Sequence, residues 1–290
     1  MPDFTALQAL AAPAGFIVLW STGYIAGRVA IDYAAPFTTL TWRFGGATLL
    51  FALVAMVRRP VAWPSVREAW HSAVVGLLTL ALQFGGVYAA FQLGASSGFA
   101  ALAIGSMPLA VSVTAASLGT RQPVGHWLGL LLGFAGVTLV LQDRLGSGLG
   151  SPAAGIALLL GLCGITFGTL YQKRYAVATD LTASLFIQNL VATLAVAPVA
   201  LLHEHFRATP APAFIASMLW LVLVNSGATF ALLFVLLRRG AATQVSTLFY
   251  LVTPVTAVMG WLLMGEPMSA IKVGGFALAA AGVYIGTRNA

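Results

Sequence analysis

The chain has 290 residues, of which 60% are hydrophobic and only 7% are charged. Soluble domains usually carry about a quarter charged residues, so this composition excludes a soluble globular protein and indicates an integral membrane protein. The net charge of +7 would suggest a nucleic-acid partner in a soluble protein, but here the basic residues act as topology signals and no nucleic-acid partner is expected.

Apolar segments of about 20 residues can cross a ~30 Å hydrocarbon core as helices. In chain order, the sequence predicts such spans at 13–31, 36–57, 71–92, 94–118, 124–142, 152–173, 181–202, 213–236, 240–264 and 269–287. The first span is expected to be retained, because no basic region precedes it as it would in a cleaved signal. The ten spans leave no room for a soluble catalytic or regulatory domain.

The basic residues also predict which way the spans face. With the N-terminus inside, nine Lys or Arg residues fall in the inner loops and at the C-terminus, against four outside. Both termini are therefore predicted to be cytoplasmic.

The chain contains an internal repeat. A shift of 146 positions superposes residues 94–140 on 240–286, and this shift matches Pro108 with Pro254 as well as several pairs of glycines. Each copy has five spans, and an odd number forces the two copies into opposite orientations. Inverted repeats are the architecture of many secondary transporters, in which two halves rock about a shared site near the midplane.

The repeat divides the chain into two predicted domains. Helices one to five occupy 1–142 and helices six to ten occupy 152–290, and a glycine- and serine-rich stretch at 143–151 is expected to be a flexible linker.

Pro108 and Pro254 lie near the middle of their spans at equivalent places in the repeat. A proline frees the carbonyl one turn earlier and weakens the helix locally, so we expect these two residues to act as hinges. The alternative is a kink that only shapes the packing.

Sequence motifs in the second half resemble a known family. Gly265, Glu266 and Pro267 precede the last span, which carries Gly275, Ala281 and Gly282, and the run 170–174 closes the sixth span. Together these residues resemble the EamA repeat of the drug/metabolite transporter superfamily, and the size and repeat pattern are most similar to its aromatic amino-acid exporter branch. The first copy departs from the motif, because Thr120 stands where Glu often follows the glycine.

The resemblance implies an all-α membrane fold of ten helices in two inverted five-helix repeats. It also implies that the first, third, fourth, sixth, eighth and ninth helices surround a central cavity, and the sequence places mid-span polar or aromatic residues on five of these helices. The candidate cavity residues are Trp20, Ser21, Tyr24, Thr79, Gln83, Thr166, Asn225, Thr229, Ser246, Tyr250 and Thr253. Hydroxyls can bond to their own helix, whereas the amides of Gln83 and Asn225 need partners.

Acidic and histidine side chains are expected only at termini and in loops, including Glu204 and His126. Proton-coupled pumps and exporters of cations usually need such groups inside the membrane, so we expect a neutral cavity for zwitterionic or neutral solutes. The sequence also shows no metal-binding motif and no serine expected beside a histidine within the membrane, so no catalytic residue, metal or cofactor is predicted.

Arg43 is the one charge placed clearly inside a span, and its repeat partner is Gln188. Its long side chain could snorkel to the membrane interface, or it could reach inward to bind a substrate carboxylate. The resemblance places the second helix outside the cavity wall, which favours the interface.

The sequence therefore predicts a multi-pass exporter in the inner membrane of a bacterium, which moves amino acids or related small metabolites by alternating access. Its partners would be the small-molecule substrate and membrane lipid, and no oligomeric state is predicted. A multidrug exporter of the same fold is the alternative within transport, and a lipid-linked sugar or phospholipid flippase and an intramembrane enzyme are rivals that the residues support less.

Overall fold

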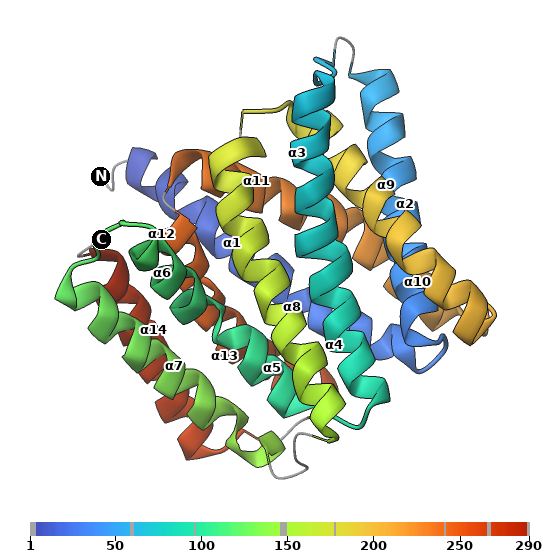
Figure 1. The fold of residues 1–290 in the computed structure, drawn as a ribbon. Helices are drawn as coiled ribbons and strands as arrows, with labels where there is room; N and C mark the ends of the chain where they lie inside the picture. Colours follow the sequence, from blue (N-terminus) through green and yellow to red (C-terminus); the bar gives the residue numbers. More distant parts are fainter. Residues whose placement is uncertain are drawn as a thin grey trace.

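A computed structural model describes residues 4–58, 61–95, 97–145, 150–176, 178–240, 242–265 and 268–288, and all named elements in these ranges are helices (Figure 1). Their bounds are α1 Phe4–Ile31, α2 Pro36–Val57, α3 Val66–Gly76, η1 Leu77–Leu82, α4 Gln83–Gln92, α5 Ser97–Gly105, α6 Met107–Ser117, α7 Val124–Leu145, α8 Pro152–Tyr171, η2 Gln172–Ala176, α9 Leu181–Val199, η3 Ala200–Glu204, α10 Pro212–Trp220, η4 Leu221–Thr229, α11 Phe230–Arg239, α12 Ala242–Thr247, α13 Phe249–Met264 and α14 Ala270–Arg288. The η segments are π-helical. Part of the predicted linker (146–149), as well as Glu266 and Pro267, lies outside the described residues.

Ten candidate membrane spans are present within the described residues, which confirms the predicted fold class. Several spans combine consecutive elements. For example, α3, η1 and α4 form the span Val66–Gln92, and α10, η4 and α11 form the span Pro212–Arg239.

The two copies of the repeat share an irregularity that the sequence does not signal. The π-helical segments η1 and η4 lie in the third and eighth spans, and a shift of 146 residues superposes Leu77–Leu82 on part of Leu221–Thr229. A π-helical turn widens the helix and changes the direction of the side chains around it. The same kind of distortion therefore lies at equivalent positions of the two repeats.

The helices pack as two lobes. One lobe contains α5, α6, α7, α12, α13 and α14, and the other contains α1, α2, α3, α4, α8, α9, α10 and α11 together with the π-helical segments. Figure 1 shows the first lobe at the lower left and α2, α3, α9 and α10 of the second at the upper right. Contacts of α1 with α13, and of α8 with α5 and α6, join the two lobes.

Glycines bring α7 and α14 together inside the first lobe. A Cβ added to Gly129 would lie 2.5 Å from Cα of Gly286, and one added to Gly136 would lie 2.5 Å from the backbone nitrogen of Ala279. Small residues let membrane helices approach closely, so these glycines provide the packing surface between a helix of one repeat and its counterpart in the other.

The prolines at equivalent positions sit in different surroundings. Pro108 follows a break between α5 and α6 at Ser106, whereas Pro254 lies inside α13, and the break in its span comes earlier, at Leu248. The two breaks are therefore not at equivalent positions in the repeat.

Candidate functional site

Arg43 on α2 is buried inside the molecule, with 3% of its surface exposed. Its Nε donates to Ser226 Oγ at 3.0 Å and its Nη2 donates to Asn225 Oδ1 at 3.1 Å, both on η4. The ring of Phe84 on α4 lies 4.5 Å from the guanidinium carbon, a cation–π distance. The side chain therefore does not snorkel, and the expectation that it reaches the interface is wrong.

Asn225 links Arg43 to α1. Its Nδ2 donates to the backbone oxygen of Leu19 at 2.8 Å, while its Oδ1 accepts from Arg43. The amide fits because Gly23 faces it, since a Cβ on Gly23 would lie 2.5 Å from Cγ of Asn225. The sequence flagged Asn225 as a polar group that needs partners, and these contacts identify the partners.

We call Arg43, Asn225, Ser226 and Phe84 the Arg43 cluster. A guanidinium carries five N–H donors, and hydrogen bonds to described residues account for two of those of Arg43. Within the described part of the chain, the other donors have no hydrogen-bond partner, and no carboxylate lies within 4 Å of an Arg43 nitrogen. The cluster is therefore a buried cation that neutral groups orient but do not neutralise.

The second repeat contains the same backbone arrangement without the cation. Gln188, at the position equivalent to Arg43, is buried on α9, and its Nε2 donates to Ser184 Oγ at 3.0 Å. An added Cβ on Gly168 would collide with Thr79, as one on Gly23 would collide with Asn225. Only the first repeat therefore carries a positive charge at this position.

The aromatic candidates on α1 have different surroundings. Trp20 is packed against Phe249 and Phe230, with ring centroids 4.8 and 5.3 Å apart, whereas Tyr24, one turn further along, is 44% exposed. Tyr24 is also near enough to Arg43 to interact with it electrostatically.

Most candidate hydroxyls bond to a backbone carbonyl. Ser21 Oγ donates to Ile17 O and also lies 3.1 Å from Val252 O, while Thr79, Thr229 and Ser246 donate to carbonyls of their own helices. These bonds satisfy the hydroxyls without a ligand.

The remaining candidate side chains are not held by hydrogen bonds in the same way. Thr253 is half-buried on α13. The buried atoms Gln83 Oε1, Thr166 Oγ1 and Tyr250 OH have no hydrogen-bond partner among the residues that the structure describes. The ring of Tyr250 packs with Leu130 and Val283 in the α7–α14 lobe, whereas the Arg43 cluster lies in the other lobe.

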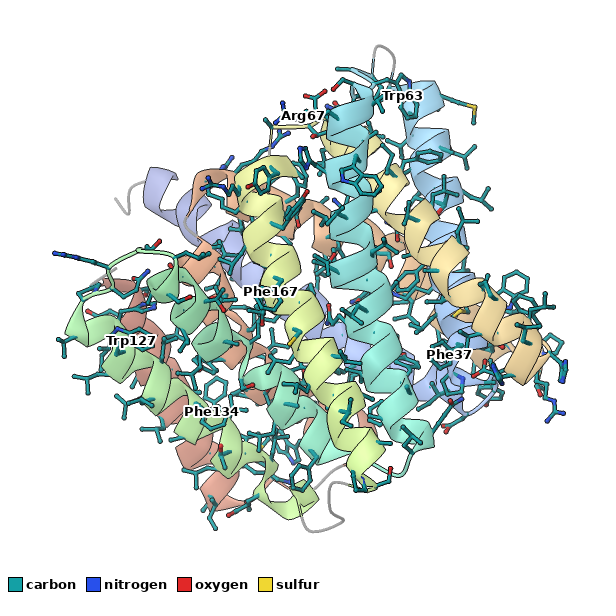
Figure 2. All side chains as sticks on the ribbon, viewed as in Figure 1. Phe37, Trp63, Arg67, Trp127, Phe134 and Phe167 are labelled. Carbon is teal, nitrogen blue, oxygen red and sulfur yellow. The ribbon has the colours of Figure 1, made fainter. Side chains whose placement is uncertain are left out.

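Glu204 corrects the expectation that acidic groups lie only in loops and at termini. It closes the π-helical end of the seventh span and is buried, where it accepts hydrogen bonds from the backbone nitrogens of Phe37 and Thr38 and from Gln92 Nε2. The carboxylate thus caps the N-terminus of α2, whose own N-cap residue, Ala35, has no side-chain acceptor. Figure 2 labels Phe37, near the start of α2, and Arg67, which lies at the start of α3, beyond the other end of α2.

His126 is a second correction. Its side chain is fully buried on α7, with Nε2 2.9 Å from Ser112 Oγ and Nδ1 3.1 Å from the backbone oxygen of Gly286. A serine and a histidine of two candidate membrane spans therefore do meet. Both side chains have 0% exposed surface, and their hydrogen bonds tie α6, α7 and α14 together.

Sequence reasoning missed Ser226 and Phe84. Serine and phenylalanine are common in membrane helices, and no spacing connects either residue with Arg43, so no sequence signal could have found them. Among the described residues, no group of three His, Cys, Asp or Glu side chains could hold a metal ion.

Several relatives of this chain are described as uncharacterised transporters. The protein described as "Uncharacterized inner membrane transporter YedA" from Escherichia coli K12 is 26% identical over 273 residues, which cover 94% of this chain and 86% of that one. "Uncharacterized protein PA1977" from Pseudomonas aeruginosa is 31% identical over 240 residues, covering 83% of this chain and 79% of its own.

A solved crystal structure has the same fold, with a TM-score of 0.80 over 97% of this chain and 96% of that one, at 20% sequence identity. The model of the EamA-like transporter family matches both halves of the chain, at residues 9–142 and 153–288. Because the family model matches both halves of the chain, and the ten spans agree with it, the chain belongs to the EamA-like transporter family.

Proposed function

We propose that this transporter exports amino acids, aromatic or of broad specificity, or related small metabolites that carry a carboxylate, and that it does so by alternating access. It would act in the inner membrane of a bacterium with both termini in the cytoplasm. The observation that carries the substrate class is the buried guanidinium of Arg43, which no described carboxylate neutralises.

Arginine is suited to bind a carboxylate. Its planar fork of donors matches the two oxygens, and charge-assisted hydrogen bonds of this kind are about twice as strong as neutral ones. Ionisable residues inside membrane spans commonly mark substrate pathways. Asn225 and Ser226 hold two of the donors of Arg43, which fixes the direction of the remaining ones.

Aromatic groups near the guanidinium of Arg43 support an amino acid with an aromatic side chain as the substrate. The ring of Phe84 faces the guanidinium, and Tyr24 lies exposed on α1 within electrostatic reach of it. Rings can stack on such surfaces. The other sequence-predicted residues stay candidates for the lining of a central cavity.

The buried cation argues against a multidrug exporter of cations. Two positive charges in a medium of low dielectric constant repel strongly, so a cationic drug would need a compensating carboxylate beside Arg43. None lies within 4 Å of its nitrogens in the described part of the chain.

The test is counterflow in proteoliposomes that contain only this protein. We expect labelled phenylalanine or another amino acid to be exchanged, and phenethylamine, which lacks the carboxylate, to be carried at least tenfold more slowly. Arg43→Gln should abolish the exchange; glutamine already occupies the equivalent buried position 188 in the other repeat, so it is a conservative choice.

Arg67→Gln is the matched control, since Arg67 is exposed at the start of α3, at the top of the view in Figure 2. Absence of counterflow with every amino acid, or equal transport of the amine, would contradict the proposal.

A further inference from the structure

We propose that the Arg43 cluster holds a small inorganic anion, chloride under cellular conditions, whenever no organic carboxylate occupies it. The proposal rests on the function proposed above, because the same donors would serve both ligands. According to this proposal, the transporter binds chloride at the Arg43 cluster while no substrate is bound.

The first step of the argument is the cost of an uncompensated charge. Arginine stays protonated in proteins, so the cluster cannot lose its charge by releasing a proton. A single charge inside a membrane is costly unless a counter-charge or water accompanies it. Asn225 and Ser226 supply dipoles to the guanidinium and no negative charge.

The second step concerns the groups around the guanidinium. Tyr24 and Tyr88 lie near enough to interact electrostatically with Arg43, and each has a hydroxyl that can donate. The hydroxyl of Tyr88 lies 3.6 Å from the place of a Cβ on Gly27, which sets it against α1. The guanidinium donors that no described residue accepts are the ones that an anion would take, and the two tyrosines add no negative charge while they stay protonated.

The third step concerns the size of the anion and the number of anions that each chain binds. Because Arg43 is only 3% exposed, a monatomic or planar anion can reach its free donors with less displacement of the helices than a bulky one. The equivalent position in the other repeat is Gln188, which carries no charge. One anion per chain is therefore expected.

Thermal unfolding of the purified full chain in detergent tests the proposal. Chloride replaces gluconate at constant ionic strength, and the melting temperature is followed. We expect a saturable rise, on the order of 5 °C at a hundredfold excess over the dissociation constant. Bromide and nitrate should reproduce the rise and sulfate should not. Arg43→Gln should abolish it, and Arg67→Gln should leave it unchanged.

A second variant covers the case in which Arg43→Gln does not fold. Arg43→Lys keeps the charge but loses the fork of donors, so the chloride midpoint should move several-fold higher. In the wild type, phenylalanine should raise the chloride midpoint in proportion to its own concentration, as a competitor does.

A melting temperature indifferent to chloride, or a chloride response that survives Arg43→Gln, would overturn the anion site. Amino-acid counterflow without any chloride effect overturns this proposal and leaves the proposed function standing. If chloride raises the melting temperature in a way that depends on Arg43, but the protein carries no amino acid, the anion site stands and the proposed function is overturned.

Discussion

Replacing Gly23 by alanine should impair transport through a residue that the substrate need not touch. The new Cβ would lie 2.5 Å from Cγ of Asn225, far inside van der Waals contact, so the amide must move. That movement breaks the hydrogen bond from Asn225 to Leu19 O, and it also breaks the hydrogen bond that Asn225 Oδ1 accepts from Arg43. The guanidinium then loses one of the two bonds that orient it.

The expected size follows from those bonds. Loss of one partner of a buried hydrogen bond costs about 1–3 kcal/mol, and each 1.4 kcal/mol is tenfold in binding. If about half of that cost falls on the substrate complex, the KM for counterflow rises by about twofold to about tenfold. The assay is initial-rate counterflow against substrate concentration, with the folded fraction measured by size-exclusion chromatography.

Gly15→Ala is the matched control on the same helix, because its Cβ would lie 3.7 Å from Leu232 Cδ1, an ordinary contact. The decisive comparison is a double-mutant cycle. In the Asn225→Ala background the collision is gone, so adding Gly23→Ala should change KM by less than twofold. A folded Gly23→Ala variant with wild-type KM, or fully additive effects, would show that Asn225 does not position Arg43.

Three further predictions concern residues outside the cluster. Glu204→Gln should lower the free energy of unfolding by about 2 kcal/mol in thermal or denaturant unfolding, because a neutral amide accepts at one atom only and caps α2 less well; unchanged stability would argue against the cap. Gly133→Ala should lose folded protein, since its Cβ would lie 2.8 Å from Tyr250 Cε2, while Gly274→Ala, which meets nothing within 4 Å, should not. Pro108→Ala and Pro254→Ala should fold and transport more slowly, with cysteine labelling from the two membrane sides shifted in opposite directions; unchanged rates and labelling would remove the hinge role.

Much of the fold could be predicted from hydrophobic length and from the repeat. Apolar runs of about 20 residues have few alternatives to a spanning helix, because unpaired backbone groups are not tolerated in hydrocarbon. Matched glycines and prolines then imply the inverted copies. The π-helical segments could not be predicted in this way, since η1 is ordinary apolar sequence and the polar residues of η4 do not by themselves indicate a widened turn.

The site was predictable only in part. Asn225 is conspicuous because an amide in an apolar span needs partners, but sequence gives the depth of a residue and not the direction in which it points. For that reason Arg43 could be read as a snorkelling residue, although α2 turns it toward η4. Glu204 and His126 lie near the ends of spans, and whether such ends are wet depends on the elements packed over them, which a sequence window does not contain.

The division into two lobes has a consequence for the movement of cargo. Each lobe contains helices from both sequence copies, and the whole Arg43 cluster, with Leu19 and Gly23, belongs to the lobe that contains α2 and α9. If these lobes are the bodies that move, the anchor for the substrate stays with one of them throughout the cycle. The other lobe, in which glycines pack α7 closely against α14, would then move relative to the substrate site and open it first to one side of the membrane and then to the other.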